Sequence, residues 1–509
     1  MVNVALWEGK WFIIGHDSLA LNLLVAFLLL VILDMIHEHS LPTEILWDIF
    51  QLFLAPSATT LEESFDDTEE LPISGTAFLY PSFKVFDARE GPWLLTHVCR
   101  QWREIALSLP SLWRSFHLDT PPKSERGAVR MLKTCLDRSA RLPLVFSVKA
   151  DRIYRHTDSQ ELLQLLNHES DRWFIIQVIN PSFKFWHHLA GSKIIQPLSS
   201  LKEISLMSTS SDEHDDAIGM LWLHDIFAKG QTPTLDTIIN HEHLTLSKFN
   251  IPWTQISVYD GAVSIAPNEH FLVLHCAPNL IRCSLAFESD EYDNVVSHGK
   301  PLLLPVLQKL RTEFLFYFED DICPALQDIV VPSLEELSII GRGSHSSPPF
   351  EVFASILRTS SCSLQYLELS GIVSDRPEAI CDLLQASATI IHLRVWINSP
   401  VHHTVIPLLN ARNFPHLVPR LQCLDLAQKD TRDVWELDML DLADTVRSRL
   451  ESNRPEGSLC ETVALHTVRF ALQTYCFVEL PKGVPPIIEV LQGEGLHIAV
   501  CRSIDPWRM

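Results

Sequence analysis

A short pattern of apolar residues recurs along most of this chain and constrains its fold more than any other feature. The pattern is apolar-x-x-apolar-x-apolar, and from Trp253 to Leu421 it returns every 26 to 31 residues. A unit of this length cannot bury its apolar face alone, so neighbouring units must stack. The copies start at Trp173, Leu201, Trp253, Leu280, Leu307, Leu334, Leu364, Ile390, Leu421 and Leu465.

The segments between these predicted strands have the spacing of helices, which indicates an α/β fold. The predicted helices are 127–139, 270–276, 350–358, 377–386 and 436–452. A further strand is expected over 142–148, and an irregular copy of the repeat near 234–246. The repeat length is in or just beyond the leucine-rich-repeat range. We therefore expect a solenoid over residues 120–480 with parallel strands on its concave face, followed by a C-terminal tail over 481–509.

Two apolar segments precede the repeats and predict short helices. The first, residues 40–50, carries Pro42 where a first helical turn would lie, and its apolar residues fall on one face. The second, residues 93–106, has the same helical spacing and ends before Pro110, because residues ahead of a proline avoid the helical region. Such short helices cannot bury all their apolar surface against each other. They either pack on the rest of the chain or leave a face for another protein.

These two segments resemble the F-box, and more closely the F-box-like proteins with leucine-rich repeats known from fungi. The matching residues are Leu41-Pro42-x-Glu44-Ile45-Leu46-x-x-Ile49-Phe50 and Val98-Cys99-x-x-Trp102-x-x-Ile105-Ala106, closed by Leu112-Trp113. In that family the F-box binds the Skp-type adaptor of a cullin-RING (SCF) ubiquitin ligase. The resemblance implies a short helical F-box module ahead of the solenoid. It also implies adaptor contacts at Leu41, Pro42, Ile45, Ile49, Val98, Cys99 and Trp102.

A long insertion divides the expected F-box-like domain, which we place at residues 40–119. A typical F-box joins its two segments within a few residues, whereas here residues 55–92 intervene, with six acidic residues between Glu62 and Glu70. A run of this kind is usually a solvated loop. A surface insertion costs little stability, since loop-closure entropy grows slowly with length. Whether the loop permits adaptor binding stays open from the sequence.

Charge and cysteine usage exclude several classes of protein. The chain of 509 residues carries 40 basic and 63 acidic residues, a net charge of −23. This balance argues against a nucleic-acid partner, whose phosphates favour clustered lysine and arginine. The 11 cysteines are scattered and form no C-x-x-C pair, which favours free thiols in a reducing compartment. We expect a cytoplasmic or nuclear protein.

An apolar stretch near the N-terminus complicates this assignment. Residues 18–33, within a leader over 1–39, are uncharged and almost wholly apolar. The stretch is shorter than the roughly 18–20 residues that a membrane-spanning helix needs. A buried or interfacial helix and a segment absent from the mature protein are equally compatible with it. A membrane anchor ranks third, because it would place the F-box away from the ubiquitin machinery.

No motif predicts catalysis or a cofactor. The chain has no nucleophile elbow, P-loop or dinucleotide fingerprint. His37-Glu38-His39 and His241-Glu242-His243 are not the H-E-x-x-H motif, and residues two apart on a helix point away from each other. His187-His188 and His402-His403 are interpreted in the same way, as loop or surface histidines. We expect no catalytic residue, no metal and no cofactor.

Two functions remain. The first is a non-catalytic substrate receptor of an SCF-type ubiquitin ligase, with the F-box on the Skp-type adaptor and, through it, a cullin. Its solenoid would present an unknown protein substrate, with no nucleic acid or membrane involved. The alternative is a leucine-rich-repeat interaction scaffold outside any ligase, tethered to a membrane by residues 18–33.

Overall fold

The structure, a computed structural model, describes part of the chain, and the chain divides into two compact units, Met1–Leu235 and Asp236–Met509. The described residues are 3–7, 10–14, 44, 46–48, 50, 83–119, 125–153, 159–180, 185, 198–207, 232–241, 246, 251–261, 267–287, 301–314, 323–341, 348–371, 377–396, 401–428, 439–451, 465–472, 492–493 and 497–502. The boundary between the units lies inside the range we expected to form one solenoid.

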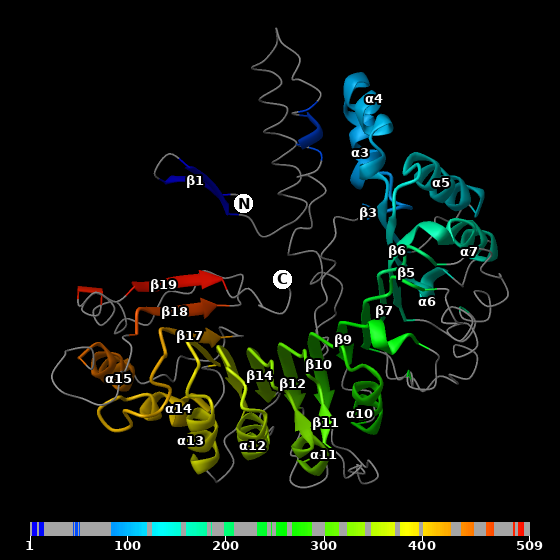
Figure 1. The fold of residues 1–509 in the computed structure, drawn as a ribbon. Coiled ribbons are helices and arrows are strands. Elements are labelled where there is room, and N and C mark those ends of the chain that lie inside the picture. Colours follow the sequence, from blue (N-terminus) through cyan, green and yellow to red (C-terminus); the bar gives the residue numbers. More distant parts are fainter. Residues whose placement is uncertain are drawn as a thin grey trace. The chain divides into compact units, whose positions relative to one another are not determined.

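The first unit contains parallel strands in the order β7-β6-β5-β4-β3 (Figure 1). Their bounds are Phe83–Lys84 (β3), Ser115–Leu118 (β4), Leu144–Lys149 (β5), Trp173–Ile179 (β6) and Glu203–Met207 (β7). The helices are Gly91–Val98 (α3), Arg100–Ser108 (α4), Glu125–Arg138 (α5), Ala150–Ile153 (α6) and Ser159–His168 (α7), with 3-10 turns at Pro110–Leu112 and Ser170–Arg172. An antiparallel hairpin of Asn3–Trp7 (β1) and Lys10–Ile14 (β2) precedes them.

The second unit continues the alternation of parallel strands and helices, in the order β19-β18-β17-β16-β15-β14-β12-β10-β9-β8. The strands are Thr237–His241 (β8), Val258–Gly261 (β9), Arg282–Phe287 (β10), Lys309–Phe314 (β12), Glu336–Gly341 (β14), Tyr366–Ser370 (β15), His392–Trp396 (β16), Cys423–Gln428 (β17), Thr467–Leu472 (β18) and His497–Arg502 (β19). The helices are Pro267–Cys276 (α10), Cys323–Gln327 (α11), Phe350–Ser360 (α12), Pro377–Ala386 (α13), Val401–Leu408 (α14) and Met439–Glu451 (α15). A 3-10 turn lies at Trp253–Gln255, and Leu302–Leu303 (β11) pairs with Ile329–Val330 (β13). Figure 1 places α10 to α15 along one side of these strands.

The predicted α/β class with parallel strands is confirmed, and the arrangement is compatible with a solenoid. The apolar pattern explains it, because alternate residues of a strand point to opposite faces of the sheet. In the regular copies the second apolar residue is buried beside its equivalent in the next strand, as Leu337 beside Leu367. In the copies that start with leucine or isoleucine, this residue is buried just ahead of its strand, as Leu334 and Leu364 are. Burying such a side chain contributes about 1.5–3 kcal/mol.

Polar side chains in the turns tie several repeats to the one before. Asn279 Nδ2 donates to Thr254 O at 2.6 Å, and Ser333 Oγ donates to Pro305 O at 2.6 Å. Thr389 Oγ1 donates to Leu364 O at 2.7 Å. Asn279, Ser333 and Thr389 each stand directly before the residue that starts a copy. Each bond satisfies a backbone carbonyl that the ladder of the sheet does not use, which fixes the turn.

The repeat that we expected to start at Trp253 starts three residues later. Tyr259 pairs with Cys283 and points into the core, while Val258 is only half-buried. The inward residues of this copy are therefore Ile256, Tyr259 and Gly261. Tyr259 hydrogen-bonds to the buried ring of His270 at 3.2 Å. Burying a polar tyrosine with its partner broke the apolar pattern that we used to set the register.

The sheet also extends beyond the limits that we predicted for it. Residues 83–84 form β3, which pairs with β4, although both strands lie within the expected F-box-like domain and β3 lies within its expected insertion at 55–92. At the other end, β19 pairs with β18 inside the expected tail at 481–509. Short strands with one or two apolar positions give a weak periodic signal, and their neighbours in the sheet decide their conformation.

No described helix is long and apolar enough to cross a lipid bilayer. The apolar stretch at 18–33 and the acidic run between Glu62 and Glu70 lie outside the described residues. So do His37-Glu38-His39 and His187-His188.

Candidate functional sites

The first candidate site is the helical module, which consists of α3, α4 and the described helical residues between 44 and 50. An extended residue, Cys99, separates α3 from α4. Its Sγ accepts a hydrogen bond from Trp102 N at 3.5 Å and so caps the start of α4. Arg103 Nε donates to Thr96 O at 2.7 Å, which ties α4 to the last turn of α3. These two bonds fix the angle between the helices.

A cluster of aromatic rings forms the core of the module. Phe50 and Trp102 are buried and meet edge to face, with ring centroids 5.0 Å apart. Trp113 is fully buried against Trp93, with centroids 4.9 Å apart, and its Nε1 donates to Ala106 O at 2.8 Å. The buried rings therefore come from both predicted segments and from the turn after α4. Edge-to-face pairs of this kind add about 0.5–1.5 kcal/mol beyond the burial of their area.

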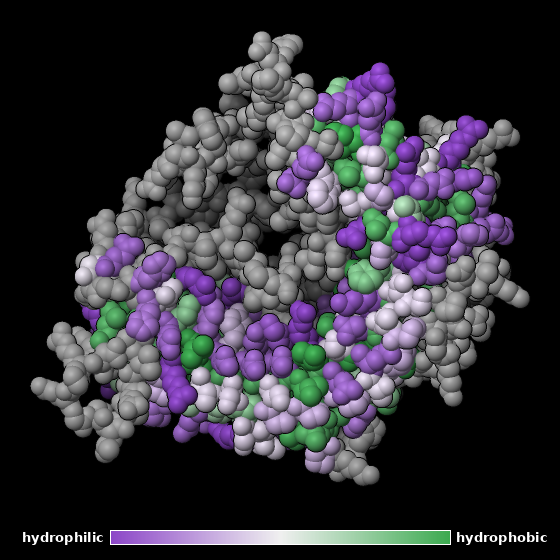
Figure 2. Space-filling view, turned by 45° about the horizontal axis from the view of Figure 1, so that its top comes forward, coloured by the Kyte–Doolittle hydropathy of each residue, from purple (hydrophilic) through white to green (hydrophobic). Residues whose placement is uncertain are grey.

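The module also exposes apolar side chains. Trp47 is 44% exposed and Val98 is 42% exposed, whereas Leu46 and Phe50 on the same helix as Trp47 are buried. Hydrophobic residues interrupt the hydrophilic surface over α3 and α4, near the top of Figure 2. Large apolar residues held at a surface by a rigid core are typical of a contact with another protein.

The seven predicted adaptor-binding residues differ in whether the structure describes them and in how exposed they are. Val98 and Cys99 are exposed. Trp102 is 5% exposed and packs in the core of the module, so it supports the helices and offers little surface to a partner. The other four residues, Leu41, Pro42, Ile45 and Ile49, lie outside the described part of the chain.

The second candidate site is a row of polar residues along the sheet of the second unit, which we call the charged row. Its members occupy equivalent positions in consecutive strands, between the two buried apolar positions of each strand, and so lie on the face opposite α10 to α15. They are Asp260, Ser284, Arg311, Ser338, Glu368, Arg394, Asp425 and Arg469.

Charges of opposite sign alternate in the C-terminal half of this row. Glu368 accepts hydrogen bonds from Ser338 Oγ at 2.6 Å and from Trp396 Nε1 at 2.9 Å. Arg394 lies between two carboxylates, with its Nη1 3.9 Å from Glu368 and its Nη2 3.5 Å from Asp425. Neighbouring strands lie about 4.8 Å apart, which brings these opposite charges into direct contact. The row is thus largely self-neutralised.

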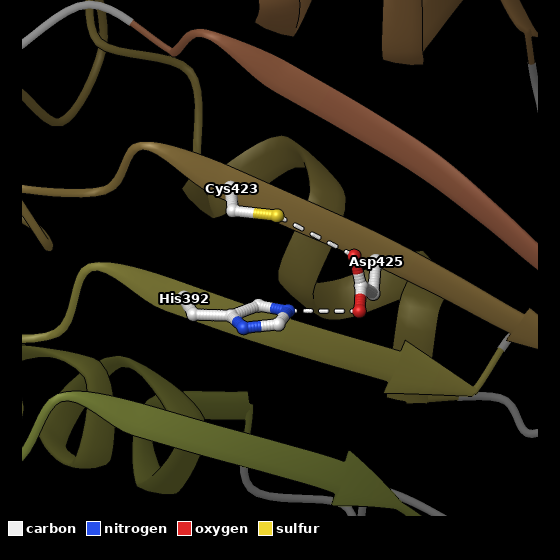
Figure 3. A group of neighbouring side chains, drawn as sticks. All are labelled: His392, Cys423 and Asp425. Atoms are coloured by element: carbon white, nitrogen blue, oxygen red, sulfur yellow. Dashed lines mark hydrogen bonds and ion pairs between the residues drawn. The ribbon is translucent and has the colours of Figure 1, made fainter. Parts of the chain in front are cut away.

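Asp425 is the centre of a dense group of polar side chains, which we call the Asp425 cluster. It consists of Asp425 and Arg469 from the charged row, together with His392 and Cys423. Its Oδ2 lies 2.8 Å from His392 Nε2. Its Oδ1 accepts from Arg469 Nε at 2.6 Å and lies 3.5 Å from Cys423 Sγ. Figure 3 shows Cys423 and Asp425 on one strand and His392 on its neighbour, all on the same side of the sheet.

The cluster changes the acidity of two of its members. Burial alone would raise the pKa of Asp425, but hydrogen bonds and charge from His392 and Arg469 outweigh it and lower that pKa to about 2. Burial and the neighbouring Asp425 carboxylate raise the pKa of the Cys423 thiol to about 12. Asp425 is therefore ionised and Cys423 protonated at neutral pH.

The donor atoms of the cluster are of the kind that bind transition metals. Among the described residues, His392, Cys423 and Asp425 are the group whose ligand atoms, one from each, all lie within 4.8 Å of one another. An imidazole, a thiolate and a carboxylate match the ligands of zinc. The sequence did not predict this group, because it needs the register between β16 and β17, which places His392 opposite Cys423. The sequence signal that could have indicated the group is a Cys-x-Asp pair in one predicted strand, with a histidine at the equivalent position of the repeat before it.

Of the histidine pairs that we examined in the sequence, His402-His403 and the first histidine of His241-Glu242-His243 lie in the described part of the chain. His241 Nε2 lies 3.5 Å from Asp260 Oδ2, at the end of β8. His402 is buried in α14 and its ring packs on that of His403, with centroids 3.9 Å apart. His402 is thus a core residue, which differs from the surface position we expected.

Comparison with known proteins adds no family to this description. No protein-family model matches the chain, and no curated protein is detectably similar to it in sequence. The candidate sites therefore stand on their geometry and on the resemblance in the two short segments.

Proposed function

We propose that this protein is a substrate receptor of an SCF-type ubiquitin ligase. The helical module acts as an F-box and binds the Skp-type adaptor, which connects it to a cullin. The repeats form a leucine-rich-repeat solenoid that holds a protein substrate on the face of the charged row. The chain itself is not catalytic: it brings the substrate close to subunits that transfer ubiquitin. Such a role fits the cytoplasm or the nucleus.

The observation that carries the proposal is the combination of a rigid core with an exposed apolar rim in the helical module. Phe50 and Trp102 come from the two F-box-like segments and are in contact, which supports a single domain built from both. Trp47 and Val98 remain partly exposed on that domain. Interfaces are enriched in aromatic anchors of this kind, and tryptophan is among the most frequent hot-spot residues.

The charged row supports the second half of the proposal. Half of its members are buried (Ser338, Glu368, Arg394 and Asp425), and the others are partly exposed on this face: Asp260, Ser284, Arg311 and Arg469. The helices α10 to α15 lie on the other side of the strands. Extended sheet faces of repeat proteins commonly serve as binding surfaces for other proteins. Charges held in fixed pairs favour selection among partners more than raw affinity.

Co-purification with the adaptor tests the proposal. We expect the full chain to retain the adaptor, and a Trp47→Ala, Val98→Asp double variant to lose it, because both side chains are exposed and their change should not disturb the core. Arg100→Ala is the control, since Arg100 is exposed on the same module and pairs with the exposed Glu104 at 2.9 Å. Equal recovery of the adaptor with the double variant and the wild type would reject the ligase role and favour the scaffold alternative.

A further inference from the structure

We propose that His392, Cys423 and Asp425 form a binding site for a zinc-class divalent cation, which enters in exchange for the guanidinium of Arg469. The site would take one nitrogen, one sulfur and one oxygen ligand from two neighbouring strands. A water molecule would complete a tetrahedral shell. The inference stands on the geometry of this cluster and is independent of the proposed ligase role.

The backbone places the three ligands where a metal needs them. Cys423 and Asp425 are two residues apart on β17 and share one face of the sheet, and His392 stands directly opposite Cys423 on β16. In a tetrahedral zinc site, bonds of about 2.0–2.3 Å place ligand atoms roughly 3.3–3.6 Å apart. Here His392 Nε2 lies 2.8 Å from Asp425 Oδ2, and Cys423 Sγ lies 3.5 Å from Asp425 Oδ1. These two contacts use different oxygens of Asp425, and the three ligand atoms, one from each residue, all lie within 4.8 Å of one another. The side chains therefore have to rotate to bring a single carboxylate oxygen, the imidazole and the sulfur onto one metal ion.

Arg469 now holds the position of a cation in this cluster. Its Nε and Nη2 lie 2.6 Å and 3.1 Å from the two oxygens of Asp425, and its Nη2 lies 3.0 Å from His392 Nε2. A metal ion would contact the same carboxylate and the same imidazole nitrogen. The side chain of Arg469 is 37% exposed, so it has a route to solvent when it leaves.

The bonding of His392 shows why this exchange is favourable for the imidazole. A protonated Nε2 donates to Asp425 Oδ2, but it then has no lone pair to accept a hydrogen bond from Arg469 Nη2. A bare Nε2 accepts from Arg469 but then faces the carboxylate oxygen. Either tautomer leaves one of the two short contacts unfavourable. A metal ion takes the Nε2 lone pair and bridges it to the carboxylate, which removes the conflict.

The chemistry of the donors selects the class of metal. One thiolate and one imidazole favour zinc, cobalt and similar ions, whereas calcium and magnesium require several oxygen ligands. On binding, Cys423 gives its thiol proton to solvent and Asp425 is already ionised. The incoming charge is partly offset because the Arg469 guanidinium moves away from the carboxylate.

Cobalt titration of the full chain, under reducing and metal-free conditions, tests the site. We expect one equivalent of Co²⁺ to produce a thiolate-to-cobalt charge-transfer absorption that Zn²⁺ abolishes by competition. The absorption should be absent in Cys423→Ser and in His392→Ala. It should persist in Cys276→Ser, which removes an exposed cysteine outside the cluster. The comparison is needed because the chain contains 11 cysteines and 23 histidines.

Removal of Arg469 separates this proposal from a loss caused by misfolding. Arg469→Met should bind Co²⁺ about tenfold more tightly than the wild type, in line with the effect of groups around the ligands on metal affinity. Arg358→Met, which breaks the exposed pair with Asp382, should leave the affinity unchanged. An absorption that persists in Cys423→Ser, or an unchanged or weaker affinity in Arg469→Met, would overturn the proposal.

Discussion

Phe50 and Trp102 lie edge to face with ring centroids 5.0 Å apart, and they join two segments that are widely separated in the sequence. The resemblance to an F-box assigned Trp102 to the contact with an adaptor. Because the ring of Trp102 is buried against Phe50, it holds the two segments together and offers little surface to a partner. The exposed Trp47 and Val98 are the better candidates for the contact itself. Stability and binding should therefore depend on different residues of the same module.

Trp102→Ala should destabilise the protein by about 3–5 kcal/mol, because it removes a buried aromatic ring and leaves a cavity. Urea unfolding of the full chain measures the change. Val98→Asp should leave the unfolding midpoint near that of the wild type while it weakens recovery of the adaptor. If the two variants showed equal unfolding midpoints, the buried position of Trp102 would be wrong.

Gly261→Ala should destabilise the second unit by about 1–3 kcal/mol through overpacking. An added Cβ would lie 2.5 Å from Cε1 of His270 and 2.7 Å from the hydroxyl of Tyr259, and both side chains are buried. The matched control is Gly493→Ala, whose Cβ would meet nothing within 4 Å. Thermal unfolding of the two variants distinguishes them, and equal midpoints would contradict this packing.

Arg449→Met should destabilise the packing of α15 on the segment that follows α14 by about 3 kcal/mol. The buried guanidinium donates to Leu409 O at 2.7 Å and to Leu417 O and Val418 O at 3.1 Å each. Methionine would leave Leu409 O and Leu417 O without this donor, whereas Val418 O would keep its bond from Leu421 N at 3.1 Å. Each unsatisfied buried group costs about 1–3 kcal/mol. The control is Arg420→Met at an exposed position. Hydrogen exchange in α15 provides the measurement, and unchanged protection would contradict this role of Arg449.

Acid should weaken the second unit partly through Asp260. Burial alone would raise the pKa of this carboxyl, but His241, together with a hydrogen bond from Ser284 and the charge of Arg311, lowers it below its usual 3.8. A carboxyl with a lower pKa in the folded state stabilises that state above the unfolded pKa. This contribution is lost as the pH falls below about 4 toward the folded pKa.

The Asp260→Asn variant tests the assignment. Its urea midpoint should be lower than that of the wild type at neutral pH, and the difference should shrink as the pH falls below about 4. The control is Asp87→Asn, because the Asp87 carboxyl belongs to the first unit and not to the second. If the difference in urea midpoint between Asp260→Asn and the wild type stayed constant down to the lowest pH, the titration of Asp260 would be excluded as the cause of that difference.

The strands and helices followed largely from apolar periodicity. The helix expected at 377–386 is α13, and the strong copies at Leu334, Leu364 and Ile390 match β14, β15 and β16. Periodicity failed where a polar residue took an inward position. Tyr259 did so beside His270, and Thr312 did so in β12, where it is buried and donates to Ser338 O at 3.3 Å. A polar residue with its partner satisfied inside the fold looks like a surface residue in the sequence.

The Asp425 cluster could not be predicted from the sequence, because its residues come from three different strands and meet only through the pairing of those strands. His392 and Cys423 become neighbours only through the pairing of β16 with β17, and Arg469 joins them from β18. Each residue alone stands at a variable position of its repeat. Once the register of the repeats is known, the row from Glu368 to Arg469 can be read directly, since its members occupy equivalent positions.

The in-register pairing of consecutive strands has a consequence for how the second unit folds. Each of its strands from β14 to β17 pairs with strands one repeat away along the chain. Such pairings close one repeat of chain and not the whole unit, which lowers the cost in loop-closure entropy compared with pairings between distant parts of the sequence. Structure can nucleate at any strongly apolar pair of repeats and spread outward. Loss of one central strand would then split the unit into two independently melting pieces, whereas loss of a terminal strand would only shorten it.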